Sequence, residues 1–142
     1  MTVATILKEK GSAVVTAPVE TTLIKITRLL NEHRIGAVVI TGSGGRIEGI
    51  VSERDIVSAV ARQGREVLNA AAGEVMTRKV FTCLPGDSLY ELMDVMTQNR
   101  IRHLPVVVDG RLEGIISIGD VVKARIAEIE LEASEMKRYI AG

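Results

Sequence analysis

The sequence predicts an α+β protein made of two β-α-β-β-α repeats that pack about a pseudo-twofold axis as one module. Three observations carry this prediction: the chain aligns with itself, each half combines short β-branched runs with helical patterns, and each half is too short to bury a stable core alone. With 142 residues, 46% hydrophobic and 25% charged, the chain has a globular balance. A chain of this size buries roughly 68–70% of its unfolded surface.

The internal repeat appears when the chain is slid along itself. Identical residues coincide at an offset of 66 and, after a loop that is one residue shorter, at an offset of 65. The pairs at 66 are Thr16/Thr82, Leu23/Leu89, Arg34/Arg100 and Ile35/Ile101, and those at 65 run from Gly45/Gly110 to Ala59/Ala124. The repeat predicts three segments: 1–65 is the first repeat with an N-terminal helix, 66–128 is the second repeat with a connecting helix, and 129–142 is a C-terminal helical extension.

Each repeat is predicted to open with a β-branched stretch, at 13–16 and 79–82, and to pass through a Pro-containing turn into a helix. Apolar residues then recur at helical spacing. They are Leu23, Ile26, Leu29 and Leu30 in the first half, and Leu89, Leu92, Met93 and Met96 in the second. Thr21 or Thr22, and Asp87 or Ser88, have the side chains preferred at helix N-caps.

Two apolar runs follow in each repeat and predict a β-hairpin. In the first half they are 36–41 and 47–51, joined by a Gly-rich turn, and in the second half 104–108 and 112–116, joined at Asp109-Gly110. The second strand of each hairpin leads directly into a helix. The segment 67–76 is expected to form one or two short helices that mirror 3–10.

Composition excludes several function classes. One Phe, two Tyr and no Trp leave almost no rings on which nucleobases can stack, and the net charge is zero, so a nucleic-acid partner is not expected. A single Cys and two His exclude a Cys/His zinc site or a disulfide framework. No apolar run approaches the ~20 residues that cross a bilayer, and the N-terminus has no signal-type block. We therefore expect a cytoplasmic protein without a membrane partner.

The hairpin-to-helix junction of each repeat carries the candidate chemistry. Ser52 and Asp55 in the first half, and Ser117 and Asp120 in the second, place a hydroxyl and a carboxylate at the start of a helix, where backbone N–H groups attract anions. A carboxylate also accepts paired hydrogen bonds from the two hydroxyls of a ribose. The same residues are preferred helix caps, so a purely structural role is the alternative.

These residues resemble the cystathionine β-synthase (CBS) domain family in its tandem, stand-alone bacterial form. The resemblance covers nearly the whole chain. It rests on residues 99–106, 114–121 and 49–56, whose sequences are NRIRHLPV, GIISIGDV and GIVSERDI. The resemblance implies a sensor of adenosine nucleotides with two pockets, each joining the Ser-x-x-Asp turn of one repeat to the opening strand of the other.

Carried over position by position, the resemblance implies two sites. Site A is expected to contain Ser52, Arg54, Asp55, Gly36, Ala37 and the stretch Val80 to Thr82. Site B is expected to contain Ser117, Gly119, Asp120, Arg102, His103, Leu104, Pro105 and the stretch Val15 to Ala17, which includes Thr16 and Ala17. The first half has Ala37-Val38-Val39 where the second has His103-Leu104-Pro105, so the two sites need not bind the same ligand.

The function expected from these features is regulatory. The chain is predicted to be no enzyme, to need no cofactor, and to bind AMP, ADP, ATP or NAD for energy sensing, passing the ligand state to an unknown regulated protein. A homodimer through CBS-pair packing is also expected. The alternatives are a structural dimerisation module without a nucleotide ligand and, with less support, a nucleotide-using enzyme, since no nucleophile and base can be assigned.

Three further residues or segments complete the predictions. From Val122 to the C-terminus, apolar residues alternate at steps of four and three. We expect the first of them, Val122 and Ile126, to pack on the repeat's own core and the rest, from Ile129, to meet a second subunit or a partner. His33 is expected at a solvated helix end. Cys83 is either a redox switch or an inert buried thiol, the usual state of a lone buried cysteine.

Overall fold

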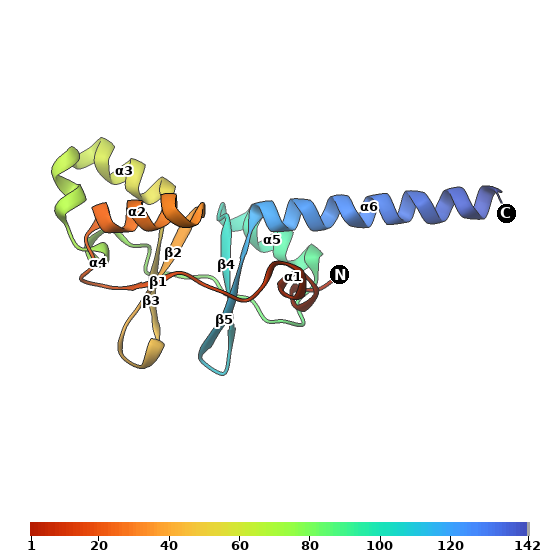
Figure 1. Cartoon of the computed structure of the whole chain (residues 1–142), viewed down its shortest axis with the longest axis horizontal. Helices are drawn as coiled ribbons and strands as arrows, with labels where there is room; N and C mark the ends of the chain where they lie inside the picture. Colours follow the sequence, from red (N-terminus) through yellow and green to blue (C-terminus); the bar gives the residue numbers. More distant parts are fainter. Residues whose placement is uncertain (142) are drawn as a thin grey trace. The chain divides into compact units, whose positions relative to one another are not determined.

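A computed structural model describes residues 1–141 (Figure 1). The chain mixes helices and short strands, and both halves share the order helix, strand, strand, helix, which confirms the predicted α+β class with two repeats. The opening strand predicted at 79–82 is not formed, because the chain makes only one isolated parallel bridge here, just after this segment, between Cys83 and Val106. The elements are α1 (Val3–Lys10), β1 (Thr16–Pro18), α2 (Leu23–His33), β2 (Ala37–Thr41), the 3-10 turn η1 (Ser43–Gly45), β3 (Ile47–Ser52), α3 (Glu53–Gln63), the 3-10 turn η2 (Arg65–Asn69), α4 (Ala72–Val75), α5 (Leu89–Asn99), β4 (His103–Val108), β5 (Arg111–Ser117) and α6 (Ile118–Ala141).

The chain forms two compact units. The first-repeat unit contains residues 13–81 and 107–113, and the second-repeat unit contains 1–12, 82–106 and 114–141. Helix α1 therefore belongs to the unit of the second repeat, although it precedes the first repeat in the sequence. The predicted segments 1–65 and 66–128 are continuous in the sequence. In the structure the two connecting segments are exchanged: residues 1–12 belong to the unit of the second repeat, and residues 65–76 belong to the unit of the first.

The first-repeat unit is built on a three-stranded sheet in the order β1-β2-β3. Strand β1 runs parallel to β2, pairing Thr16 with Val39, and β2 runs antiparallel to β3, pairing Ala37 with Ser52. Residues 37–40 of β2 are all buried, as expected of a central strand covered on both faces. The sequence pattern predicted the opening strand at 13–16, but the strand starts three residues later, at Thr16. It starts there because Thr16 is the first residue that pairs in register with β2.

The hairpin turns match the sequence prediction. In β4-β5, Asp109 and Gly110 both have positive φ, 51° and 76°, which is the backbone that a two-residue type I′ turn requires. In β2-β3, Gly44 and Gly45 have φ of 70° and 77°. These are conformations that glycine adopts without steric cost.

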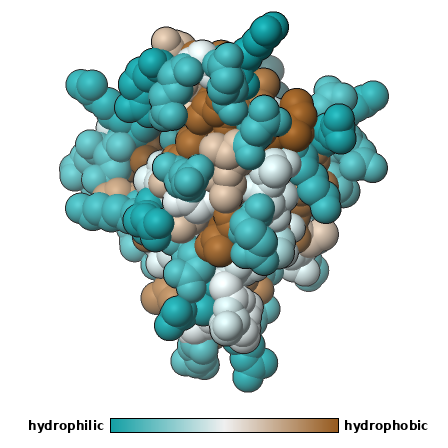
Figure 2. Space-filling model, turned by 90° about the vertical axis from the view of Figure 1, so that its left-hand side faces the viewer, coloured by the Kyte–Doolittle hydropathy of each residue, from teal (hydrophilic) through white to brown (hydrophobic). Residues whose placement is uncertain are grey.

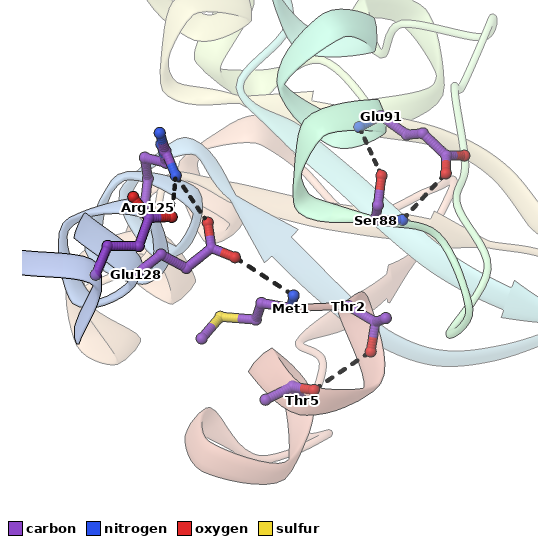
Figure 3. A network of polar contacts seen from close by, with 8 residues as sticks. Met1, Thr2, Thr5, Ser88, Glu91, Arg125 and Glu128 are labelled. Atoms are coloured by element: carbon purple, nitrogen blue, oxygen red, sulfur yellow. Dashed lines mark hydrogen bonds and ion pairs between the residues drawn. The ribbon is translucent and has the colours of Figure 1, made fainter. Parts of the chain in front are cut away.

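The helices begin and end where the sequence places their signals. Thr22 accepts a hydrogen bond from the backbone N–H of Lys25, and Ser88 forms a reciprocal capping box with Glu91 (Figure 3). His33 is the exposed last residue of α2, as predicted. Both α2 and α5 end on an arginine in the left-handed region, Arg34 and Arg100, which the repeat aligns.

The connecting segments α1 and α4 dock in the same way on opposite repeats. Each segment is held by three backbone hydrogen bonds, and each bond in one unit has a counterpart in the other unit. In the second-repeat unit they run from the N–H groups of Val3, Ala4 and Leu89 to the carbonyls of Asp87, Pro85 and Met1, at 3.0, 2.9 and 3.1 Å. In the first-repeat unit they run from Ala72, Gly73 and Leu23 to Thr21, Val19 and Ala70, at 2.7, 2.9 and 2.9 Å. The structure thus confirms that 67–76 mirrors 3–10.

Helix α6 closes the second-repeat unit and makes two kinds of contact near its start. Val121 and Ala124 are buried. On the next turns, Glu128 accepts from the N-terminal amino group of Met1 at 3.3 Å and from Arg125 at 3.2 Å (Figure 3). The C-terminal part of α6 extends beyond α1 and α5 of its own unit (Figure 1), and residues 129–141 are all exposed.

The prediction that Val122 and Ile126 pack on the repeat's own core is wrong. Each is 51% exposed, while Val121 and Ala124 turn inward. Successive helical residues are separated by 100°, so once the stripe through Val121 and Ala124 faces the unit, Val122 and Ile126 lie on a different face. The heptad pattern of α6 is therefore exposed from its first residue.

The surface is mixed in character. On the face drawn in Figure 2, brown hydrophobic residues appear in small groups between teal hydrophilic side chains. Within residues 1–141 no helix has the length and hydrophobicity needed to cross a membrane.

Gly49 of β3 and Gly114 of β5 occupy corresponding positions and lie against the connecting segments. We expect their replacement by alanine to lower the free energy of unfolding by different amounts. A Cβ on Gly49 would lie 2.6 Å from Met76 Sδ and 2.9 Å from the backbone oxygen of Thr77, whereas one on Gly114 would meet only the Leu7 side chain, nearest at 2.7 Å. We expect Gly49→Ala to destabilise the protein by about 2 kcal/mol, and Gly114→Ala by less than about 1 kcal/mol because a side-chain tip can move. Urea unfolding of both variants measures this, and equal costs would contradict the explanation.

Candidate functional site

Both Ser-x-x-Asp turns have the same geometry. In the first repeat the Ser52 N–H donates to Asp55 Oδ2 at 2.9 Å, and the Asp55 N–H donates to Ser52 Oγ at 3.2 Å. In the second repeat the corresponding distances between Ser117 and Asp120 are 2.8 and 3.2 Å. The capping role expected of these residues is therefore present, and it holds each carboxylate at the N-terminus of a helix.

Each turn is joined by one further hydrogen bond to the residue just before the first strand of its hairpin. The N–H of Glu53 donates to the carbonyl of Gly36 at 3.0 Å, and the N–H of Ile118 donates to the carbonyl of Arg102 at 2.8 Å. Ala37 also pairs with Ser52 across β2 and β3. Predicted residues from the middle and the end of each repeat thus meet within one unit.

The two turns differ in what else contacts the aspartate. Asp55 Oδ1 accepts from the hydroxyl of Thr77 at 3.2 Å, and its Oδ2 also accepts from the Ser52 hydroxyl at 3.1 Å. Asp120 instead forms an ion pair with Lys10, whose Nζ lies 2.6 Å from Oδ2 and also donates to the carbonyl of Ile115 at 2.8 Å. The first site holds its carboxylate with neutral donors, whereas the second site holds it with a cation.

The environment of Asp120 lowers the pKa of its carboxyl. Burial alone would raise this pKa, but the hydrogen bond from Lys10, the hydrogen bonds from Ser117 and the positive charge of Lys10 outweigh the burial. Asp120 is therefore ionised at neutral pH and available as a hydrogen-bond acceptor.

The remaining predicted residues fall into two groups. Arg54 lies in the first turn of α3, Gly119 in the first turn of α6, and His103, Leu104 and Pro105 open β4, with Leu104 and Pro105 buried. Thr16 and Ala17 belong to the first-repeat unit, as does Val80, while Thr82 belongs to the second-repeat unit. Because each predicted site combines residues of both units, the assembly of the complete pockets stays a prediction.

Two hollows adjoin the predicted residues. A depression of about 580 Å³ beside Gly36 lies in the first-repeat unit, between α2 and the start of α3, and Leu30, Ile35, Ile56 and Val57 supply its apolar lining. A smaller hollow of about 120 Å³ adjoins Asp120 and is lined by Lys10, Glu9 and Lys123 among others. Ligand pockets measure roughly 300–1,000 Å³, so the hollow on the Lys10 side does not by itself hold a nucleotide.

Sequence reasoning missed Lys10 and Thr77. Lys10 is 110 residues away from Asp120 along the chain, and Thr77 is 22 residues from Asp55. Neither lies in a motif. Both residues lie in or beside the connecting segments: Lys10 ends α1, and Thr77 follows α4 shortly before the second repeat begins. Knowing that α1 packs with the second repeat and α4 with the first would have placed Lys10 near Asp120 and Thr77 near Asp55.

Cys83 is a buried free thiol beside β4. Burial, followed by the negative charge of Asp87, raises its pKa to about 12. The thiolate is the reactive form, so the structure favours the inert thiol over the redox switch. Among residues 1–141, no group of three or more His, Cys, Asp or Glu side chains is arranged to hold a metal ion.

Comparisons with known proteins point to one family. A family model described as the CBS domain matches residues 10–62 and 72–127. The CBS domain-containing protein CBSX3, mitochondrial, of Arabidopsis thaliana is 32% identical over 149 residues, which cover 99% of this chain and 72% of that protein. The crystal structure of the CBS-domain containing protein ATU1752 from Agrobacterium tumefaciens has a TM-score of 0.85 and 45% identity, covering 87% of this chain and 92% of that one.

A similar structure was solved with adenosine-type ligands. The CBS domain pair of protein MJ0100 was solved in complex with 5′-methylthioadenosine and S-adenosyl-L-methionine. It has a TM-score of 0.81 and 25% identity to this chain, covering 90% of this chain and 98% of that one.

Removing the cation beside Asp120 should lower stability in a pH-dependent way. Because the folded-state pKa of Asp120 lies below its unfolded value, the pair stabilises the fold above about pH 4 and is lost as pH falls through the folded pKa. We expect Lys10→Met to lower the free energy of unfolding by on the order of 1 kcal/mol at pH 7, since both side chains are partly exposed. The difference from wild type should shrink in acid to the contribution of the hydrogen bond from Lys10 to the carbonyl of Ile115.

The matched control is Lys8→Met, which removes an exposed cation from the same helical turn. Urea unfolding between pH 2 and pH 7 measures both variants. A Lys10→Met effect that is independent of pH, or equal to that of Lys8→Met, would contradict the role of the pair.

The thiol of Cys83 should be unreactive in the folded protein. At pH 8 a thiol with a pKa of about 12 has little thiolate. We expect alkylation by iodoacetamide to be at least about a hundredfold slower in the native protein than in urea. Mass spectrometry of timed samples measures both rates, and similar rates would show that the thiol is accessible and activated.

Proposed function

The chain belongs to the CBS-domain family, and on that basis we propose that it is a non-enzymatic regulatory module that binds an adenine-containing ligand and transmits the bound state to a protein partner. The ligands considered are AMP, ADP, ATP and NAD. We also propose that the module acts in the cytoplasm in energy sensing and forms a homodimer through packing of CBS pairs.

The observation that carries the proposal is the duplicated Ser-x-x-Asp turn with one geometry in both repeats. Each turn combines a carboxyl group with the N-terminus of a helix, where backbone N–H groups and the helix dipole favour an anion. A nucleotide carries two vicinal hydroxyls for the carboxylate and a phosphate for the helix. The adenosine-type ligands of MJ0100 support this ligand class.

The contacts of the two aspartates favour Asp120 as the stronger ribose acceptor. Lys10 and Ser117 both donate to Oδ2 of Asp120, and we propose that a ribose hydroxyl donates to Oδ1. At Asp55, the Thr77 hydroxyl already donates to Oδ1, so a ribose must displace it. A neutral hydroxyl donor also stabilises the carboxylate less than an ammonium does. We therefore expect unequal affinities at the two turns.

The adenine base would be recognised without aromatic stacking. Only 2% of the chain is aromatic, while buried aliphatic residues such as Leu104 lie next to the predicted residues of β4. Aliphatic side chains would pack on the two faces of the base, and backbone groups would read its edge.

The alternative function is a structural module in which the turns are only caps. The capping box of Ser88 and Glu91 favours it, because α5 shows the same reciprocal pattern with no predicted ligand role. An enzyme that uses a nucleotide has less support, since we assign no nucleophile and base.

Calorimetric titration of a ligand-stripped sample tests the proposal. We expect at least one of AMP, ADP, ATP and NAD to bind, and Asp120→Asn to weaken that binding about tenfold or more, because an amide does not supply charge-assisted acceptance. Asn keeps an oxygen for the Ser117 N–H, so the cap survives.

The matched control is Ser88→Ala, which removes a helix cap of the same kind in the same unit. Its affinity should equal that of wild type. Absence of binding at millimolar ligand by the folded protein would favour the structural module, and an unchanged affinity in Asp120→Asn would reject the site.

A further inference from the structure

Helix α6 carries a continuous apolar stripe that its own unit does not cover. We call Val122, Ile126, Ile129, Ala133, Met136 and Ile140 the α6 stripe. Its large members range from 49% exposed at Ile129 to 78% at Ile140. The spacing alternates between four and three residues and so keeps all six on one side of a coiled helix. A stripe of this kind typically docks on another surface.

The stripe follows a heptad repeat. Ile126, Ala133 and Ile140 take the a positions, and Val122, Ile129 and Met136 take the d positions. Isoleucine at a favours parallel dimers when d is Leu, and here d holds no Leu, so the flanking charges carry the choice of partner. Residues 122–140 extend about 28 Å at 1.5 Å per residue, which gives a short but complete seam.

We propose that the α6 stripe binds the α6 stripe of a second copy of this chain as a parallel, in-register coiled coil. The flanking charges favour this partner. In a parallel pair, each g residue faces the e residue five positions later on the other helix. Arg125 then faces Glu130, and Glu132 faces Lys137. Each pair occurs twice in the dimer, so all four contacts join opposite charges.

The antiparallel arrangement has the opposite electrostatics. The register that covers the whole stripe sets Ile126 against Met136 and Ile129 against Ala133. It then brings Lys123 close to Lys137, and each of Glu130 and Glu132 close to its own copy in the other chain. Every flanking contact between charges is repulsive, so the charge pattern selects the parallel orientation.

Arg125 donates to Glu128 on its own helix at 3.2 Å, so facing Glu130 of the second copy requires it to share or exchange that pair. Glu132 lies 3.8 Å from Arg125 on its own helix, with 68% of its side chain exposed. Residues one turn away from Lys137 are Ala133 and Ala141, which are uncharged, so Lys137 is not committed to an ion pair along the helix. The stripe lies on a different face from Val121 and Ala124, and its use does not depend on nucleotide binding.

Sedimentation equilibrium of the full chain tests whether the stripe holds the dimer. We expect wild type to be dimeric and Ile129→Lys to associate at least about tenfold more weakly, because the substitution would bury two like charges in the seam, while the proposed packing of CBS pairs remains. Leu131→Lys is the matched control, since Leu131 is 61% exposed on the same helix but outside the stripe. It should stay dimeric. A monomeric wild type, or an Ile129→Lys variant that associates as tightly as wild type, would overturn the proposal.

A charge reversal tests the orientation. In the parallel coil, Lys137→Glu turns two attractive contacts repulsive and should weaken dimerisation by about fivefold. The double variant Glu132→Lys with Lys137→Glu should restore it. In the antiparallel coil, Lys137→Glu would instead pair with Lys123 and strengthen the dimer. Arg138→Glu, with the same change in net charge on the outer face, is the control and should bind as wild type does.

Discussion

The reciprocal hydrogen bonds between serine and aspartate at the start of α3 and α6 are the constraint on which each repeat depends. Each turn ends a partly buried strand, satisfies N–H groups that a helix leaves unpaired, and fixes the direction in which the helix leaves the hairpin. The same contacts hold a carboxylate on the protein surface near the preceding strand. Structural and ligand-binding roles therefore require the same two residues, and a cap does not exclude a site.

Duplication kept this turn and changed what surrounds it. The exchange of connectors brings α1 to the second repeat and α4 to the first through corresponding backbone hydrogen bonds. The side chains delivered by the two connectors differ, and so Asp120 meets Lys10 while Asp55 meets Thr77. The inequality of the two proposed sites thus follows from the connectors and not from the turns themselves.

The sequence predicted those features whose causes are local. Period and turn residues located α2, α5 and both hairpins, and Asp109-Gly110 adopts the predicted turn. It did not predict Lys10, because an ion pair between residues 110 apart depends on how α1 docks. It also placed Val122 and Ile126 on the wrong face of α6. The heptad pattern is real, but the buried face is set by Val121 and Ala124, which pack on the rest of the unit.

The account centres on Asp120 as the residue that binds the ribose of an adenine nucleotide. A crystal structure of the chain grown with AMP tests this most directly. It should show a ribose hydroxyl within hydrogen-bond distance of the Asp120 carboxylate and the phosphate near a helix N-terminus. AMP bound at another place, with Asp120 contacted only by Ser117 and Lys10, would contradict the account.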